Sequence, residues 1–152
     1  MSAFYCEQLG LRRIDQTRYL TFLSCNRDHH SIAFAASDGA SLHHIAFEMA
    51  EIDSVMRGAG RMRDAGFPIE WGVGRHGPGD NVFAYFIGPD DAVIEYTAEV
   101  EQVDASYQVR GPDEWVWPPG RTDQWGIAVG PSPRLAQAQK RLRFAPGLFH
   151  AA

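Results

Sequence analysis

Polar and apolar residues alternate most clearly between residues 42 and 49. The odd-numbered positions from Ile45 to Met49 are apolar, whereas His44 lies on the opposite face together with Glu48. Alternation with a period of two is typical of a strand with one buried face. Because helices normally cover the apolar side of such a sheet, we expect His44 to point away from them, on the polar side of the sheet.

The next stretch, 51–65, has apolar residues at helical spacing and ends at Gly66, with Pro68 shortly after it. That combination predicts a helix that packs on the sheet. Three extended stretches rich in β-branched and aromatic residues follow it, at 68–73, 82–87 and 92–98. Residues 42–98 therefore predict one complete module with the order strand, helix, strand, strand, strand (βαβββ).

The first forty residues predict part of a second module of the same kind. Apolar residues at positions 4, 5 and 9, followed by Gly10, indicate the end of a helix. The stretches 19–25 and 31–35 are rich in aromatic and branched residues, which predicts two strands. This order is the back part of a βαβββ module without its opening strand, so we expect the chain to begin inside the module.

The composition changes beyond residue 100. The segment 111–120 is rich in turn-forming residues and contains two tryptophans, and Trp125 follows it. Because disordered tails contain few aromatic residues, we expect this segment to lie over the polar side of the sheet or over a neighbouring subunit. Residues 132–143, with Pro133 in the first turn, predict a final basic helix.

Composition and charge narrow the classes of function. The 152 residues are 45% hydrophobic and 12% aromatic, which is enough for one domain with a sizeable core. A formal net charge of -5 argues against a nucleic-acid partner and against attraction to an anionic membrane. No stretch approaches the roughly 20 apolar residues of a membrane span, and Cys6 and Cys25 form no CxxC pair. We expect a cytoplasmic protein that acts on a small molecule.

Candidate chemistry gathers in the stretch 74–95. It places His76, Tyr85 and Glu95 on short apolar runs joined by the turn 88–91, so a hairpin would bring the three side chains together. The succession of Gly74, His76, Tyr85, Pro89 and Glu95 resembles the signature of type I extradiol ring-cleavage dioxygenases. Phe4-Tyr5 followed by Leu9-Gly10-Leu11 is similar to a frequent feature of their fold, the vicinal oxygen chelate fold.

The resemblance implies an α+β fold in which paired βαβββ modules form a half-open cup around a metal ion. Residues 1–100 would form this domain, with an incomplete first module (1–40) and a complete second module (41–100), and residues 101–152 would form a C-terminal extension. His44 and Glu95 match two metal ligands of the family, and the remaining histidine ligand lies on the opening strand that this sequence lacks. The implied metal is Fe(II), with Mn(II) as the alternative, because two histidines and one carboxylate suit non-haem iron.

The same resemblance implies acid–base roles for other residues. His30 matches a histidine that protonates a reaction intermediate, and an imidazole titrates near the working pH. His76 and Tyr85 match groups that bind the substrate oxygens and assist deprotonation, and Asp80 is a further candidate that would orient His76. The implied reaction is the cleavage of an aromatic vicinal diol by O2, and we expect the protein to form a homo-oligomer.

Each of these residues also has a purely structural interpretation. A histidine on a strand, such as His44, is more often hydrogen-bonded than metal-bound, and Tyr85 is by default a packing aromatic residue. Asp80 is most simply a turn residue. Glu95 is more informative, because a carboxylate within an apolar run is costly unless it is paired or metal-bound. An edge strand that faces solvent would also explain it.

Two other functions stay open at this point. A glyoxalase-like metalloenzyme on the same fold, either an isomerase or a thiol transferase, would not need the pair His76 and Tyr85. A truncated, inactive or partner-dependent domain, including a small-molecule binder, is favoured by the missing strand, which would leave a sheet edge unpaired. We expect no other histidine to replace the missing ligand, because His29 and His43 lack a motif and His150 lies near the terminus.

Overall fold

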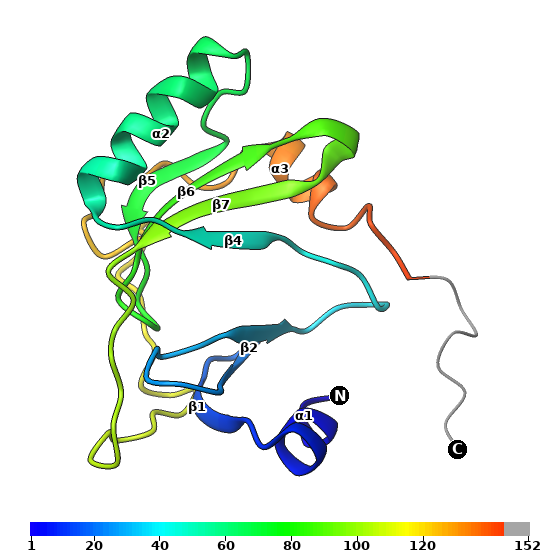
Figure 1. Ribbon diagram of the computed structural model, residues 1–152, viewed down its shortest axis with the longest axis vertical. Helices are drawn as coiled ribbons and strands as arrows, with labels where there is room; N and C mark the ends of the chain where they lie inside the picture. The colour runs from blue at the N-terminus through cyan, green and yellow to red at the C-terminus, as the bar shows by residue number, and fades with distance from the viewer. Residues whose placement is uncertain (145–152) are drawn as a thin grey trace.

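The computed structural model describes residues 1–144, which form two sheets and three α-helices (Figure 1). The prediction of an α+β fold is confirmed. In chain order, the elements are α1 (Ser2–Leu9), β1 (Arg12–Gln16), β2 (Leu20–Ser24), β3 (Ile32–Ala35), β4 (Ile45–Glu48), α2 (Ile52–Asp64), β5 (Trp71–Arg75), β6 (Val82–Ile87), the 3-10 turn η1 (Pro89–Asp91), β7 (Val93–Ala98) and α3 (Pro133–Ala138). None of the helices in residues 1–144 is long and apolar enough to cross a membrane.

The first sheet consists of β1, β2 and β3, all antiparallel. Helix α1 precedes it and ends at Gly10, whose φ of 72° is the left-handed conformation that favours glycine. Strand β1 was not predicted from the sequence. Its register shifts between Arg13 and Gln16, so the adjacent residues Ile14 and Asp15 are both buried and the period of two is lost.

The second sheet has the strand order β4-β7-β6-β5, in which β4 runs parallel to β7 and the other pairs are antiparallel. Helix α2 packs on β6 and β7. Figure 1 shows α2 on the outer side of this sheet and α1 beyond the other sheet, so the two sheets lie between the helices. The predicted order of strands around α2 is the observed one, although β5 begins at Trp71 rather than at residue 68.

Strand β6 is buried on both faces, which explains its uninterrupted apolar sequence. Val82, Ala84 and Phe86 pack under α2. Phe83, Tyr85 and Ile87 point to the other face, where they pack with Leu135 and Ala138 of α3. Tyr85 therefore lies on the side of the sheet away from α2, and the side chains that share its face can form a site there.

The apolar face of β4 differs from the expectation. Ile45 and Phe47 are 48% and 51% exposed, although a helix was expected to cover them. The reason is that α2 lies over β6 and β7, whereas β4 is at the edge of the sheet. Met49, just after β4, does pack against the core under α2.

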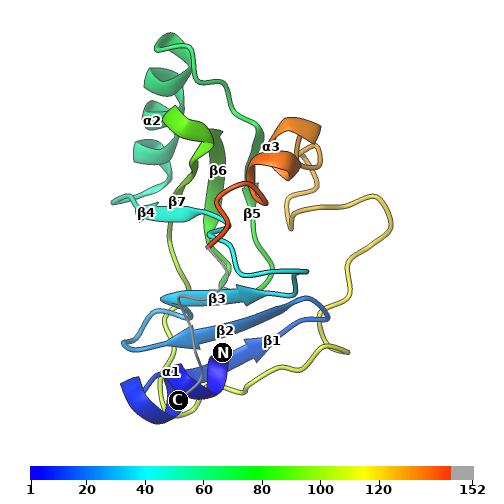
Figure 2. The ribbon, with the colours of Figure 1, turned by 90° about the vertical axis from the view of Figure 1, so that its right-hand side faces the viewer.

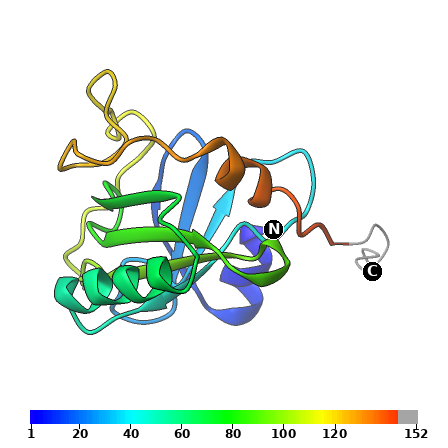
Figure 3. The ribbon, with the colours of Figure 1, turned by 90° about the horizontal axis from the view of Figure 1, so that it is seen from above.

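The segment after residue 100 connects the two sheets along one side of the molecule (Figures 2 and 3). Near its start, Arg110 accepts a backbone hydrogen bond from Gln16 of β1. Further on, Trp117 lies against Gly77, in the loop between β5 and β6. Helix α3 starts at the cap Ser132, whose hydroxyl accepts from the Leu135 amide, and it is shorter than the predicted 132–143.

Candidate functional site

The second sheet brings three of the predicted residues onto one face. Tyr85 of β6 pairs directly with Glu95 of β7, so their side chains point the same way. On the other side of β7, Ala46 of β4 pairs with Glu95, and His44 is two residues before Ala46, on the same face. His76 follows immediately after β5, the strand next to β6. Neighbouring strands thus place these side chains around the carboxylate of Glu95.

The distances show that the four side chains meet. His44 Nε2 lies 3.1 Å from Glu95 Oε2, and His76 Nε2 lies 3.5 Å from Glu95 Oε1. His76 Nε2 is also 3.2 Å from the Tyr85 hydroxyl oxygen. Tyr85 and Glu95 are each only 3% exposed, whereas the His44 and His76 side chains are 27% and 21% exposed. The carboxylate is therefore at the bottom of the cluster and the imidazoles are nearer to solvent.

Burial and charge shift the pKa values in this cluster in opposite directions. Burial by itself raises the pKa of Glu95, but His44 and His76 outweigh it and lower the pKa to about 2. Burial, followed by the nearby charge of Glu95, raises the pKa of Tyr85 well above its ordinary value. At neutral pH the site therefore combines an ionised carboxylate with a phenol that keeps its proton.

A metal ion in this cluster would have His44 and Glu95 as its ligands. Oε1 of Glu95 is buried and accepts no hydrogen bond among the described residues, because its contact with His76 Nε2, at 3.5 Å, is an ion pair only. Such a position is costly for a carboxylate oxygen unless something else binds it. No three histidine, cysteine or acidic side chains within residues 1–144 are grouped so that they could hold a metal. The pair fits two of the three protein positions of a two-histidine, one-carboxylate site, and His150 lies outside the described residues.

His30 lies in the loop between β2 and β3 of the first sheet, beside this cluster. Its ring is next to Gly79 in the loop between β5 and β6, where an added Cβ would be 2.9 Å from His30 Cε1. Burial and the adjacent His29 lower the pKa of His30 to about 4, and Glu95, His76 and His44 are close enough to influence it as well. The imidazole is therefore neutral near pH 7.

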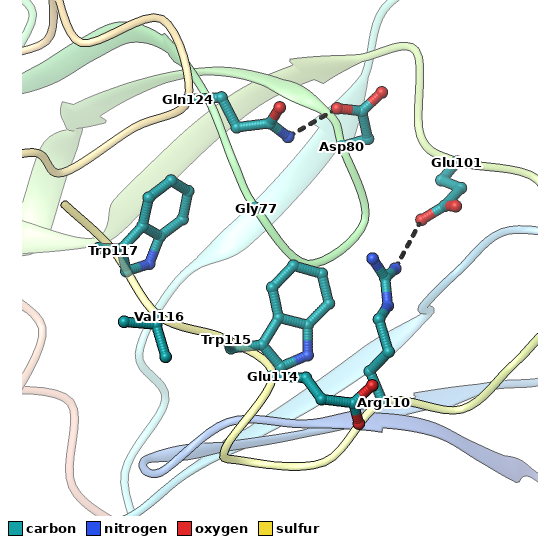
Figure 4. Close-up of a pocket in the computed structure, with 9 residues that line it drawn as sticks. All are labelled: Gly77, Asp80, Glu101, Arg110, Glu114, Trp115, Val116, Trp117 and Gln124. Carbon is teal, nitrogen blue, oxygen red and sulfur yellow. Dashed lines mark hydrogen bonds and ion pairs between the residues drawn. The ribbon is translucent and has the colours of Figure 1, made fainter.

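Asp80 occupies a different position from the one expected. One carboxylate oxygen accepts a hydrogen bond from Gln124, at 2.6 Å, and the other lies 3.6 Å from the Arg75 guanidinium. The described contacts of its carboxylate do not include the His76 ring. Asp80 lines a cavity of about 380 Å³, and Figure 4 shows how it lies among the other lining residues. The residues that line this cavity are Gly77, Asp80, Glu101, Arg110, Glu114, Trp115, Val116, Trp117 and Gln124.

Two histidines that received no role in the sequence analysis contact the predicted ones. His29 is fully buried, and its Nδ1 lies 3.0 Å from His30 Nδ1, while its Nε2 lies 3.1 Å from Asp15 Oδ2. His43 Nδ1 lies 2.7 Å from His44 Nδ1. The sequence signal was the repeated His-His pair, because neighbouring imidazoles can bond to each other. Asp15 had no such signal, since it lies on the strand that the periodicity missed.

Comparison with known proteins shows which family this chain resembles. Residues 1–96 match the model described as Glyoxalase/Bleomycin resistance protein/Dioxygenase superfamily. Metapyrocatechase 2 of Cupriavidus necator is 34% identical over 135 residues, which are 83% of this chain and 40% of that protein. A biphenyl-2,3-diol 1,2-dioxygenase of Metapseudomonas furukawaii is 32% identical over 117 residues, 70% of this chain and 38% of that protein. The chain therefore spans well under half the length of these curated relatives.

Solved structures agree with the sequence comparison. The Mn(II)-bound glyoxalase from Novosphingobium aromaticivorans has a TM-score of 0.81 at 38% identity, over 99% of this chain and 48% of that one. BphC, described as a halotolerant catechol dioxygenase, has a TM-score of 0.65 at 27% identity, over 72% of this chain and 39% of that one. These matches confirm the predicted vicinal oxygen chelate fold. The chain belongs to the Glyoxalase/Bleomycin resistance protein/Dioxygenase superfamily, and the curated relatives that it matches are extradiol dioxygenases.

Proposed function

We propose that this chain provides the metal-binding and substrate-binding residues of an Fe(II)-dependent extradiol dioxygenase, which cleaves a catechol-type ring with O2. The observation that supports the proposal most directly is the convergence of His44, His76 and Tyr85 around the buried carboxylate of Glu95. The names of the curated relatives point to the same reaction.

In this proposal His44 and Glu95 would hold the metal ion, with Fe(II) as the expected ion and Mn(II) as the alternative. His43 supports the assignment of His44, because metal-bound histidines usually bond through their other ring nitrogen, and His44 Nδ1 bonds to His43. When bound, such an ion supplies adjacent positions for the diol oxygens and O2 and lets electron density pass between them. The proposal places the third protein ligand outside residues 1–144.

The remaining residues would bind the diol and move its protons. Tyr85 keeps its proton because its pKa is raised, so its hydroxyl can donate a hydrogen bond to a substrate oxygen. His76, whose Nε2 is in contact with that hydroxyl, would orient the same part of the diol. His30 is neutral at neutral pH, because its pKa is lowered to about 4, so it can accept the proton of a diol hydroxyl as a general base.

The test is to load the protein anaerobically with Fe(II), add catechol or 2,3-dihydroxybiphenyl, and then admit O2. We expect O2 uptake with loss of the diol, and Tyr85→Phe should lower kcat by about 10²-fold, as expected when one positioned acid–base group is removed. Tyr96→Phe is the matched control, because Tyr96 packs against the core on the α2 side of the sheet. Diols that stay intact in the loaded wild-type protein would argue against the proposal.

A second candidate is a glyoxalase-like isomerase, because the structure with a TM-score of 0.81 is named a glyoxalase. An isomerase rearranges its substrate without consuming O2. It would also not need the contact between His76 and Tyr85, so His76→Ala and Tyr85→Phe would leave its turnover nearly unchanged. Measuring O2 uptake and the effect of these two variants on the same protein preparation separates the two functions.

A further inference from the structure

We propose that Asp15 and His29 act as positioning residues that fix the tautomer of His30, with its proton on Nδ1 and a free lone pair on Nε2. The placement of the proton follows from hydrogen bonds within the protein. Its consequence for the reaction rests on the proposed function, in which His30 is the general base.

Asp15 is fully buried and surrounded by hydrogen-bond donors. Its Oδ1 accepts from the Arg110 backbone N–H at 2.8 Å. Its Oδ2 lies 3.3 Å from Arg110 Nε and accepts from the Tyr107 hydroxyl at 3.0 Å. The Tyr107 hydroxyl accepts in turn from an Arg110 guanidinium nitrogen, which can only donate, so the Tyr107 proton is free to point at Asp15. Backbone and guanidinium N–H groups can only donate, so Asp15 acts as an acceptor-only carboxylate.

The carboxylate determines the tautomer of His29. Nε2 of His29 lies 3.1 Å from Asp15 Oδ2, and two lone pairs at that distance would repel, so Nε2 carries the hydrogen. Arg110, which also pairs with Glu101, already places a positive charge beside Asp15, and a second cation in this fully buried position would be costly. The single hydrogen of the His29 imidazole is therefore on Nε2, which leaves Nδ1 with a lone pair that accepts.

His30 completes the chain of hydrogen bonds. Its Nδ1 lies 3.0 Å from His29 Nδ1, which has a lone pair and no proton, so His30 Nδ1 donates. Nε2 is then the basic nitrogen of His30, and it can take the proton from the O–H group of the diol without any change at Nδ1. The resulting imidazolium would keep its Nδ1–H bond to His29, with the Asp15 carboxylate behind that ring. The same use of a carboxylate to hold a histidine in one tautomer is known from serine proteases.

The geometry provides a variant that should reverse the whole chain. In Asp15→Asn, an amide oxygen at the Oδ1 position keeps the hydrogen bond from the Arg110 backbone N–H, which the main chain holds in place. The flexible Arg110 side chain, whose Nε lies 3.3 Å from the Oδ2 position, then has to turn away from the amide NH2. The amide NH2 then takes the Oδ2 position and donates to His29 Nε2. His29 would then carry its proton on Nδ1 and donate it in a hydrogen bond to His30 Nδ1. The proton of His30 would move to Nε2, and that nitrogen would no longer have a lone pair with which to act as a base.

The experiment is long-range 1H–15N NMR of the histidine rings in the metal-free protein at neutral pH. We expect protonated Nε2 in His29 and protonated Nδ1 in His30 in the wild-type protein, and the opposite for both in Asp15→Asn. Tyr107→Phe is the matched control, because it removes one donor to Asp15 without replacing the acceptor, and it should keep the wild-type tautomers. A wild-type His30 with its proton on Nε2, or an unchanged tautomer in Asp15→Asn, would overturn the proposal.

His29→Gln keeps the proposal testable if Asp15→Asn does not fold. Its amide can still donate to Asp15 but offers no imidazole acceptor to His30, so we expect His30 to populate both tautomers. Retention of the single Nδ1–H tautomer in this variant would count against a role for His29.

Kinetics then test the consequence for the reaction. Asp15→Asn should lower kcat for diol cleavage by about 10²-fold or more, the usual effect of losing a general base, with KM nearly unchanged. Asp53→Asn, at an exposed carboxylate on α2, is the surface control and should retain wild-type kinetics. If the wild-type protein does not cleave diols, the proposed function fails while the NMR result on the tautomers still decides this inference. A full kcat in Asp15→Asn with reversed tautomers would show that His30 is not the base.

Discussion

The two sheets each contribute a pair of adjacent histidines, and the pairs differ in where the carboxylate lies. In both pairs the rings bond through their Nδ1 atoms, at 3.0 Å for His29 and His30 and at 2.7 Å for His43 and His44. In the first pair, Asp15 contacts His29, the ring farther from the site. In the second pair, Glu95 contacts His44, the ring within the site.

This difference shows how one dipeptide can serve two purposes. A carboxylate behind the outer histidine leaves the inner one with a free nitrogen, which suits proton transfer. A carboxylate beside the inner histidine places a nitrogen and an oxygen together, which suits a metal ion. The outer histidines also differ in burial, because His29 is fully buried whereas His43 is exposed. We therefore expect the two pairs to respond differently to mutation and to pH.

The largest expected effect is a difference in metal affinity between variants of the two carboxylates, Glu95 and Asp15. Glu95→Gln should weaken Mn(II) binding by more than about 100-fold, because even a residue that only supports a ligand typically contributes 10- to 100-fold. Asp15→Asn should leave the affinity within a few-fold of wild type, because Asp15 contacts no proposed ligand. Glu48→Gln, at an exposed carboxylate on β4, is the matched control. Titration of the metal-free protein, followed by electron paramagnetic resonance, measures all three. Equal losses in the Glu95 and Asp15 variants would contradict the division of roles.

A smaller effect is expected on stability when the outer histidine of each pair is removed. His29→Ala should lower the free energy of unfolding by about 1–3 kcal/mol, because it takes a hydrogen bond from the buried Asp15 carboxylate. His43→Ala should change it by less than about 0.5 kcal/mol, as is usual for an exposed side chain. Urea unfolding of the two metal-free variants provides the comparison. A loss at His43 as large as that at His29 would mean that both pairs are structural.

The smallest effect concerns pH. Because the pKa of His30 is lowered from 6.5 to about 4 in the folded protein, the unfolded chain binds a proton first as the pH falls. The contribution of His30 to stability is complete above pH 6.5 and is lost progressively toward pH 4, with about 1 kcal/mol lost between pH 6.5 and 5.5.

The measurement is the unfolding free energy of the metal-free protein at these two pH values, in wild type and in His30→Gln. We expect the variant to lack this part of the pH dependence. Desolvation also lowers the pKa of His43, but solvent reaches its exposed ring, so His43→Gln should change the pH dependence less. An identical pH dependence in wild type and His30→Gln would show that His30 is not desolvated in solution.

The elements that the sequence predicted well are those whose burial follows a simple period. Strand β6 was predicted at 82–87, its observed bounds, because an uninterrupted apolar run between turn residues is typical of a strand buried on both faces. Strand β1 was missed because its bulge places Ile14 and Asp15 on the buried side together. Ile45 and Phe47 were expected to be covered, and their exposure depends on the lateral position of α2, which periodicity does not describe.

The candidate site was also predicted only in part from the sequence. The gathering of His44, His76, Tyr85 and Glu95 was expected, because a resemblance in residue order and the hairpin between β6 and β7 both pointed to it. The support of His30 by Asp15 was not expected. Asp15 lies 14 residues from His29 and more than 90 residues from Tyr107 and Arg110. Contacts between such distant residues, in a segment without regular structure, leave no local pattern in the sequence.

The contacts of Tyr107 and Arg110 with Asp15 have a practical consequence for anyone who shortens this chain. The match to the superfamily ends at residue 96, so trimming the protein to that boundary would keep His30, His44, His76, Tyr85 and Glu95, the described residues proposed to touch metal or diol. It would also remove the arginine counter-charge of the buried Asp15 carboxylate and two of its hydrogen bonds. A minimal version of the domain would thus retain the outline of the site and lose control over where the proton of its base resides.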